Sequence, residues 1–191
     1  LQVTRGVAPR DHAFPAGARP SIVMTAKRTK GPPPKAVEEG VSVITIPDQR
    51  WARCDIKSVS LLPNVLGKQR AKEAGAFEAW QVDRAGNVTE GTSTNAWIVT
   101  EKGEVVTRKA DEAILNGITR LAVLDIIRSE GLAFIERPFS VEEAKSAREA
   151  FLTSTTSLVL PVVSIDGTPI GDGKPGPFTR RLREYYQKHM T

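Results

Sequence analysis

Cysteine, histidine and aromatic residues are all scarce in this sequence of 191 residues. Cys54 has no second cysteine to pair with, which excludes an internal disulfide and a cysteine-rich zinc site. The two histidines, His12 and His189, are far apart and no His-x-x-x-His spacing occurs, so we expect no metal site. Aromatic residues make up 6% of the chain, which is few for a groove that stacks the bases of a nucleic acid.

Long apolar runs and targeting segments are also missing. The longest apolar stretches, such as Val41–Ile46 and Leu158–Val163, have the length of strands, whereas a membrane span needs about 20 consecutive apolar residues. We expect no signal peptide, because Leu1–Arg5 already has the pattern of a strand and carries charge. Together with the single cysteine, these features lead us to expect a cytoplasmic protein with no membrane partner.

The charge balance is mildly basic, because 27 Lys and Arg residues face 22 Asp and Glu residues and give a formal charge of +5. The surplus is spread along the chain, with clusters only at Lys27–Lys35 and Arg180–Lys188. We interpret it as a solvated basic surface and expect no nucleic-acid partner. An anion or nucleic-acid binder stays open as an alternative, and it predicts binding that weakens steeply with salt. No Gly-x-Ser-x-Gly, Walker or Gly-x-Gly-x-x-Gly motif supports a serine hydrolase, a P-loop protein or a Rossmann fold.

Hydrophobic periodicity and turn residues predict an α/β fold of the mixed α+β kind, with antiparallel hairpins rather than a doubly wound sheet. The expected strands lie at 1–6, 21–26, 41–46, 51–56, 77–83, 88–90, 95–100, 104–107, 132–135, 151–153 and 159–165. The expected helices lie at 62–74, 118–130 and 177–189, and another follows the capping box Ser140-Val-Glu-Glu143. The apolar faces of the first two helices are expected at Leu62, Val65, Leu66 and Gln69, and at Leu121, Leu124, Ile126 and Ile127.

A proline-rich segment is expected to divide the chain. Residues 31–35 include three successive prolines, which stiffen the backbone and donate no hydrogen bonds. We interpret them as a linker between a short region, 1–30, and a larger region, 36–191. Because residues 1–6 have the pattern of the middle of a strand, we expect that a segment upstream of them has been lost.

Small hydroxyl-bearing residues and glycines gather at Thr89–Asn95, Asn116–Arg120 and Thr153–Ser157. Hydroxyls and unpaired backbone N–H groups at the start of a helix suit a phosphate group. Gly117 leads directly into the predicted helix 118–130, so the next amides should be free donors. Capping of helices and turns without any ligand is the alternative explanation.

Lys57 and Glu90 are further candidates for chemistry. Lys57 is flanked by Ile56 and Val59, and a lysine amine among apolar neighbours can be nucleophilic and form a Schiff base. Such a lysine is more often an ordinary surface residue. Glu90 ends an expected strand and is either a turn carboxylate or the partner of a buried cation. Composition leaves these alternatives open.

Four segments carry a resemblance to a known family: RCDIKSVSLLPNVLGKQRAKEAGAFEA (53–79), TEGTSTNAW (89–97), LNGITR (115–120) and FLTSTTS (151–157). In this order and spacing they resemble the class IV (fold type IV) aminotransferases, pyridoxal-phosphate enzymes that include D-amino-acid and branched-chain aminotransferases and aminodeoxychorismate lyase. Residues 3–15 are most similar to the D-amino-acid aminotransferase branch. The resemblance implies a large domain with a mixed sheet or pseudo-barrel and helices, preceded by the tail of a truncated N-terminal small α/β domain.

The resemblance also implies roles for individual side chains. Lys57 would form the Schiff base and move the proton between the substrate Cα and the cofactor. Glu90 would keep the pyridine nitrogen protonated, because an anion beside that nitrogen favours the pyridinium. Arg10 and His12 match a trap for the substrate carboxylate that reaches into the partner subunit's site, and this implies a homodimer.

The three hydroxyl clusters acquire roles in the same way. The backbone amides of Ile118 and Thr119 and the hydroxyl of Thr155 would bind the phosphate of pyridoxal 5'-phosphate. The cofactor would be lined by Thr92, Ser93 and Thr94. The implied function is transfer of an amino group from a D-amino acid such as D-alanine to a 2-oxo acid such as 2-oxoglutarate. A branched-chain L-amino-acid aminotransferase, an aminodeoxychorismate lyase and a non-catalytic truncated chain are the alternatives.

Overall fold

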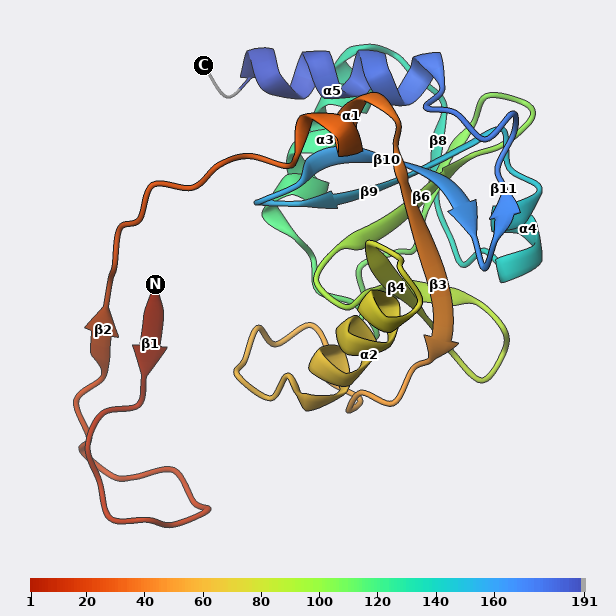
Figure 1. Cartoon of the computed structure of the whole chain (residues 1–191). Coiled ribbons are helices and arrows are strands. Elements are labelled where there is room, and N and C mark those ends of the chain that lie inside the picture. The colour runs from red at the N-terminus through yellow and green to blue at the C-terminus, as the bar shows by residue number, and fades with distance from the viewer. Residues whose placement is uncertain (190–191) are drawn as a thin grey trace. The chain divides into compact units, whose positions relative to one another are not determined.

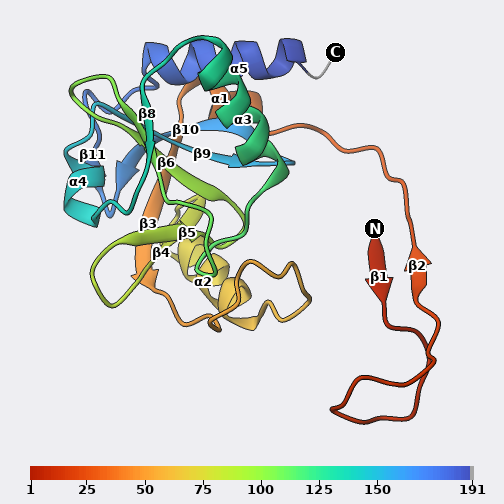
Figure 2. The same cartoon turned by 180° about the vertical axis from the view of Figure 1, so that it is seen from behind.

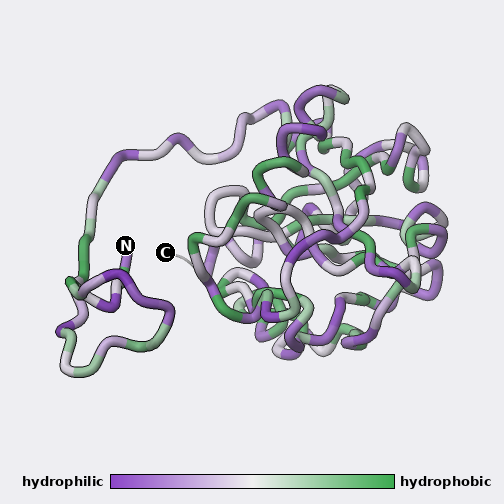
Figure 3. Tube along the Cα trace, turned by 90° about the horizontal axis from the view of Figure 1, so that it is seen from below, coloured by the Kyte–Doolittle hydropathy of each residue, from purple (hydrophilic) through white to green (hydrophobic). Residues whose placement is uncertain are grey.

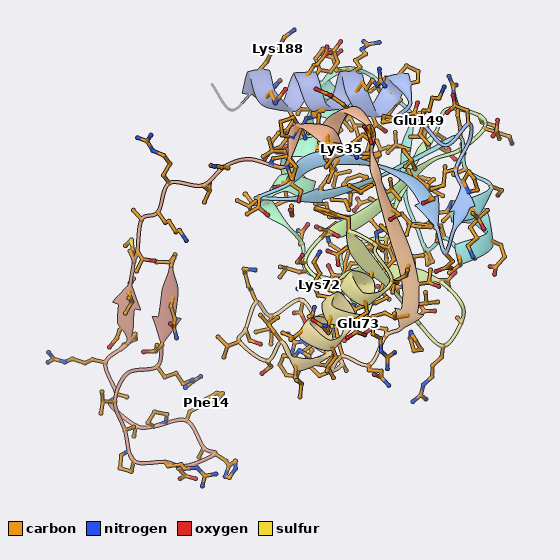
Figure 4. All side chains as sticks on the ribbon, viewed as in Figure 1. Phe14, Lys35, Lys72, Glu73, Glu149 and Lys188 are labelled. Atoms are coloured by element: carbon orange, nitrogen blue, oxygen red, sulfur yellow. The ribbon has the colours of Figure 1, made fainter. Side chains whose placement is uncertain are left out.

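The computed structural model describes residues 1–189 and divides the chain into two units, Leu1–Lys30 and residues 31–191. The first unit is a hairpin in which β1 (Gln2–Thr4) pairs antiparallel with β2 (Ser21–Val23), as Figure 1 shows. In the long loop between them, the Arg5 guanidinium lies 3.5 Å from the centre of the Phe14 ring, a cation–π contact (Figure 4). Both expected strands of this region are therefore present, in shortened form.

The second unit contains five helices and nine strands among the described residues. The helices are α1 (Pro34–Glu38), α2 (Leu62–Glu73), α3 (Ile118–Ser129), α4 (Val141–Lys145) and α5 (Pro177–His189). The strands are β3 (Val41–Pro47), β4 (Glu78–Val82), β5 (Val88–Gly91), β6 (Asn95–Val99), β7 (Val105–Thr107), β8 (Phe134–Glu136), β9 (Glu149–Ser154), β10 (Leu158–Ile165) and β11 (Thr168–Pro169). Helix α1 begins inside the segment expected to be a linker, so residues 34 and 35 are helical.

All nine strands belong to one curled, mixed sheet, in the order β5-β4-β3-β10-β9-β6-β7-β8 with β11 added on β10. The pairs β3–β4, β3–β10 and β7–β8 are parallel, and the remaining pairs are antiparallel. Four strands separate β5 from β6 in this order, yet residues 92–94 join them directly, with the Gly91 amide bonded to the Thr94 carbonyl. The sheet must curl for so short a turn to connect them. The mixed fold predicted from the sequence is confirmed.

Both faces of the sheet are buried, because successive side chains of a strand point to opposite faces. Ala96 and Ile98 of β6 belong to one hydrophobic cluster, whereas Trp97 and Val99 belong to another. The second cluster lies under α3 and α5, which pack next to each other in Figures 1 and 2. Figure 3 shows that hydrophobic and hydrophilic stretches alternate along the chain of the second unit. This two-sided packing holds the strand ends that carry the site.

A buried carboxylate fixes the start of α5 on the sheet. Glu149 of β9 is 5% exposed and accepts hydrogen bonds from the amides of Phe178 and Thr179 and from the Thr179 hydroxyl, the last two at 2.8 Å. Figure 4 shows Glu149 beside this end of the helix. An anion at a helix N-terminus satisfies unpaired N–H groups and complements the helix dipole.

Helix α2 has the predicted length, but its apolar face does not pack into the core. Leu62, Val65 and Leu66 are 68%, 59% and 54% exposed, whereas Gly67 and Ala71 are buried. The helix approaches the sheet through its small residues because these permit a close backbone contact. The apolar stripe predicted for α3 is buried except at Leu121, which is 39% exposed.

The strand expected at 51–56 is wrong. These residues form bends and turns after the chain leaves the sheet at Pro47, and the Cys54 amide bonds the Glu112 carbonyl at 2.8 Å instead of joining a strand ladder. Ser140 is confirmed as the N-cap of α4, since its hydroxyl accepts from the Glu143 amide at 3.1 Å, but the reciprocal half of the capping box is not formed, because the Glu143 carboxylate pairs with Arg137. None of the described helices has both the length and the apolar character needed to cross a membrane.

The core predicts a clear difference between two leucine deletions. Leu152 in β9 is fully buried, so Leu152→Ala should lower the free energy of unfolding by about 2–5 kcal/mol through a residual cavity. Leu62→Ala removes the same atoms from an exposed position and should change it by less than about 1 kcal/mol. Urea denaturation measures both, and equal losses would contradict the described packing.

Candidate functional site

Glu90, at the end of β5, is a buried carboxylate with three kinds of partner. It is 6% exposed, and it accepts hydrogen bonds from Nη1 of Arg50, from Nδ2 of Asn95 at 3.0 Å and from the amide of Leu115 at 3.2 Å. The donors come from the segment after β3, from β6 and from the segment before α3. Glu90 is therefore the partner of a buried cation, one of the two alternatives that the sequence left open.

That cation, Arg50, ties three segments together. Its Nε and Nη2 donate to the two carboxylate oxygens of Asp48 at 2.9 and 2.6 Å, a bidentate pairing that suits the planar guanidinium. Nη2 also donates to the Thr89 hydroxyl at 3.1 Å and to the Ala113 carbonyl at 3.0 Å. With 5% of its side chain exposed, Arg50 is almost fully enclosed by these acceptors.

The charges in this cluster do not balance. One guanidinium is shared by two carboxylates, so the cluster carries a surplus negative charge when both carboxylates are ionised. Burial raises the pKa of Glu90 to about 7, although Arg50 and the Leu115 amide favour its ionised form. Burial also acts to raise the pKa of Asp48, but hydrogen bonds from Arg50 and Thr89 outweigh it and lower that pKa overall. A cation placed beside Glu90 would remove the surplus.

Asn95 connects Glu90 to the segment that starts α3. Its Nδ2 donates both to Glu90 and, at 2.8 Å, to the Leu115 carbonyl. A Cβ at Gly117 would lie 2.5 Å from the Asn95 Oδ1, so only glycine permits this approach. Asn95 is also the ladder partner of Thr153 near the end of β9. Three of the four segments singled out in the sequence therefore meet at this one residue, two of them through its side chain and the third through its backbone.

The N-terminus of α3 offers unpaired amides. Gly117 is its extended N-cap, and within the described chain no side chain caps this end through a hydrogen bond. The amides of Ile118 and Thr119 are therefore placed to bind an anion, aided by the helix dipole. Thr155 is exposed in the turn after β9, two residues beyond the ladder partner of Asn95. The three predicted phosphate ligands thus lie on segments that converge.

The hydroxyls of the 92–94 turn point to a protein carboxylate. Thr92 and Ser93 donate to the two oxygens of Glu78 at 2.5 and 3.0 Å, and Thr94 lies 3.4 Å from the second oxygen. The sequence assigned these three residues to the lining of the cofactor without identifying this acceptor. In the structure their hydroxyls have an internal partner, and Ser93 alone of the three is exposed.

Lys57 lies in an exposed loop that is fixed at both ends. Before it, the Cys54 amide bonds the Glu112 carbonyl, and after it Asn64 of α2 donates to the Thr92 carbonyl at 2.8 Å. The loop is therefore anchored next to the segment that bonds Glu90 and to the turn that follows Glu90. Ile56 and Val59 are 44% and 84% exposed, so the apolar surroundings expected for Lys57 are not formed within the described chain.

The remaining candidates, Arg10 and His12, lie on the exposed loop between β1 and β2 in the first unit. Their role in substrate binding stays a prediction. Among residues 1–189, no group of three or more His, Cys, Asp and Glu side chains is arranged to hold a metal ion. A cavity of about 630 Å³ borders Asp48, Arg50, Cys54 and Arg108, but neither Lys57 nor Glu90 lines it. It lies beside the site described above.

Four residues of the site were not found from the sequence: Asp48, Arg50, Glu78 and Asn95. Asn95 belonged to a quoted cluster but received no role. The Asp-x-Arg spacing of 48 and 50 at the end of a predicted strand was a possible signal, since it matches a local bidentate pair. Nothing in the sequence marks Glu78 as the acceptor of hydroxyls more than a dozen residues away.

The chain matches one known protein family over most of its length. The sequence profile of the amino-transferase class IV family matches residues 1–165. This chain belongs to the class IV aminotransferases. D-alanine aminotransferase of Bacillus licheniformis is 47% identical over the whole of this chain and 66% of its own length. D-alanine aminotransferase of Staphylococcus haemolyticus is 43% identical over the whole of this chain and 67% of its own length.

Solved structures of class IV aminotransferases share the fold. The branched-chain amino acid aminotransferase of Escherichia coli has a TM-score of 0.86 at 25% identity, covering 99% of this chain and 64% of its own. The branched-chain amino acid aminotransferase of Thermobaculum terrenum, solved in its PLP holo form, has a TM-score of 0.72 at 29% identity, covering 80% and 51%. The chain thus spans about two thirds of the curated relatives it matches and about half of some solved ones.

The donor set of the site fits pyridoxal 5'-phosphate, the cofactor of this family. The uncapped N-terminus of α3 suits its phosphate group, because the amides there lack a side-chain partner. The surplus negative charge of the Glu90 cluster suits a protonated ring nitrogen. Asn95 links these two features, because its side chain bonds both Glu90 and the segment before α3.

Removing Arg50 should be costly. Arg50→Met leaves Asp48 and Glu90 buried without their shared cation, and we expect the free energy of unfolding to fall by about 3–5 kcal/mol. Arg128 pairs with Asp125 on the surface, with 51% of its side chain exposed, so Arg128→Met should change it by less than about 1 kcal/mol. Chemical denaturation of both variants makes the comparison, and a small effect at Arg50 would show that the cluster does not depend on its cation.

The raised pKa of Glu90 predicts a pH dependence of stability. Between pH about 4.5 and 7, Glu90 keeps its proton in the folded protein but has lost it in the unfolded chain. The contribution of Glu90 to the free energy of unfolding is therefore fully present below this window and is lost as the pH rises through it. Against Glu90→Gln, which cannot titrate, the cofactor-free protein should lose up to about 3 kcal/mol across the window. The pKa of Asp48 is lowered, so this group changes the free energy of unfolding only at lower pH. Parallel stability curves for the two proteins would contradict the assignment.

Proposed function

We propose that the protein is a pyridoxal-phosphate-dependent transaminase that moves an amino group from a D-amino acid, such as D-alanine, to a 2-oxo acid, such as 2-oxoglutarate. The observation that carries the proposal is the convergence of Glu90, the 92–94 turn and the start of α3 around Asn95. The relatives named D-alanine aminotransferase, which match the whole chain, support the choice of substrate.

Each group has a task in the proposed reaction. The cofactor supplies an electron sink for the bonds at the substrate Cα. The amides of Ile118 and Thr119 and the Thr155 hydroxyl bind its phosphate. Glu90, held by Arg50, keeps a proton on the ring nitrogen. The Lys57 amine, which is exposed in a loop anchored beside Glu90, would bind the cofactor covalently and would take and return the proton at the substrate Cα.

Substrate recognition is assigned to the first unit. Arg10 and His12 are exposed there and carry the donors that a substrate carboxylate requires. We propose that they serve the site of a second copy of the chain, which makes the enzyme a homodimer, and that it works in the cytoplasm. A second candidate for the amino donor is a branched-chain L-amino acid, because solved structures that share the fold are named branched-chain amino acid aminotransferases.

The covalent role of Lys57 has a direct test. Protein purified with pyridoxal 5'-phosphate should absorb at the boundary of the visible and ultraviolet, and borohydride reduction should fix the cofactor on the peptide that contains Lys57. Lys57→Ala should lose both the fixed cofactor and more than about 99% of turnover. Lys72→Ala, an exposed lysine of α2 (Figure 4), should behave like the unaltered protein. Cofactor fixed on another lysine would refute the assignment.

The choice of donor is tested by comparing substrates. Addition of D-alanine should shift the absorbance of the bound cofactor, whereas L-leucine should not, and the reverse result selects the branched-chain alternative. Arg10→Ala should raise the KM for D-alanine at least about tenfold without altering the unreacted spectrum, since one charged hydrogen bond is lost. Arg28→Ala, also exposed in the first unit, is the matched control.

A further inference from the structure

Glu78 is a buried carboxylate for which the proposed reaction has no use. It is the first residue of β4, it is 0% exposed, and it lies under the turn that connects Glu90 to β6. Its carboxylate accepts hydrogen bonds from the hydroxyls of Thr92 and Ser93 and from the Ala79 amide, the last at 2.9 Å. A buried carboxylate is stable only when such donors replace the water it has lost.

The same carboxylate also faces α2. The Lys68 ammonium lies 3.6 Å from Glu78 Oε1 and donates to the Phe77 carbonyl at 2.5 Å. One turn earlier on the helix, Asn64 bonds the Thr92 carbonyl. Gly67 lies between them, and a Cβ there would be 2.9 Å from the Thr92 methyl group. Helix α2 and the 92–94 turn are thus packed against each other with Glu78 beneath both.

This arrangement decides which atoms the turn offers to a ligand. The hydroxyls of Thr92 and Ser93 are occupied by Glu78, and the Thr92 amide bonds the Ala79 carbonyl at 3.1 Å. The amides of Ser93 and Thr94 have no hydrogen-bond partner among residues 1–189. Ser93 is the exposed residue of the turn and Thr94 is buried, so the Ser93 amide is the candidate donor for a ligand.

We propose that Glu78 is a positioning residue of the site, which turns the hydroxyls of Thr92 and Ser93 inward so that the 92–94 turn meets the cofactor with backbone amides. Glu78 acts through the turn and touches no reacting atom. The same carboxylate keeps α2, and with it the end of the Lys57 loop, in register with Glu90. This inference rests on the proposed cofactor, but its effect on the turn does not require that the cofactor be bound.

Glu78→Gln is the direct test, since it keeps the size of the side chain and removes one acceptor oxygen and the charge. In the cofactor-free protein, hydrogen–deuterium exchange at the Gly91 and Thr92 amides should become at least about tenfold faster, because the turn loses its anchor. The Kd for pyridoxal 5'-phosphate should rise roughly tenfold or more. At saturating cofactor, the kcat of Glu78→Gln should come closer to that of the unaltered protein than its Kd does, as expected of a residue that positions the turn.

Glu149→Gln is the matched control. Glu149 is likewise a buried glutamate that accepts from backbone amides and a threonine hydroxyl, but it fixes α5 and lies outside the site. It should lower stability without changing exchange at Gly91 and Thr92 or the Kd for the cofactor. If Glu149→Gln raises the Kd as much as Glu78→Gln does, the effect is general destabilisation and the inference is overturned.

The hydroxyl of Thr92 provides a second, independent variant. Thr92→Val removes the donor and should reproduce the faster exchange. Thr92→Ser keeps the donor and should exchange as slowly as the unaltered protein. In Glu78→Gln the further change Thr92→Val should add little, because the contact is already lost. Additive effects would overturn the inference.

The outcomes separate this inference from the proposed function. Unaltered protein that fails to bind pyridoxal 5'-phosphate refutes the proposed function, while the exchange measurement still decides the role of Glu78 in the turn. Unaltered protein that binds the cofactor, together with a Glu78→Gln protein whose exchange and Kd are unchanged, refutes the inference and leaves the function standing.

Discussion

The contact between Arg50 and Glu90 organises the site, because it brings together the ends of strands that are distant in the sequence. Arg50 follows β3, Glu90 ends β5, and the Ala113 carbonyl that Arg50 also binds belongs to the segment before α3. An arginine with 5% of its side chain exposed has little contact with bulk water, so the protein must supply most of the acceptors around it. The positions of these acceptors define the distance between the sheet and the start of α3.

The charge imbalance of the cluster formed by Arg50, Asp48 and Glu90 explains why one carboxylate has a structural role while the other can interact with a further cation. Asp48 engages two nitrogens of the guanidinium and is its main counter-ion. Glu90 receives the remaining nitrogen, an amide and a carboxamide, and burial leaves it close to the midpoint of its titration at neutral pH. The ionisation of a group in that condition responds strongly to a charge that arrives nearby.

Much of the fold was predictable because local patterns and long-range packing agree. Periodicity predicts most strands of the sheet and the helices α3 and α5, and the core buries their apolar residues. The Ser140 N-cap likewise follows from a local capping pattern. Residues 51–56 and the outer face of α2 were mispredicted because apolar sequence there is not matched by burial in the described chain. Within the site, Glu90 and the start of α3 were recognisable from motifs. The roles of Arg50, Asn95 and Glu78 include contacts that span 14 to 63 positions of sequence, which no local pattern contains.

Gly67 shows what the close packing of α2 demands of the chain. Glycine weakens a helix interior by about 1 kcal/mol relative to alanine, yet it stands in the middle of α2. An alanine methyl group there would come within 2.5 Å of the Ile46 side chain and 2.9 Å of the Thr92 methyl group. The helix therefore accepts a weaker backbone at a position where it touches both the sheet and the turn. Any mutational route that strengthens α2 by conventional helix-forming residues must leave position 67 untouched, or it will push α2, and with it the loop that carries Lys57, away from Ile46 and the 92–94 turn.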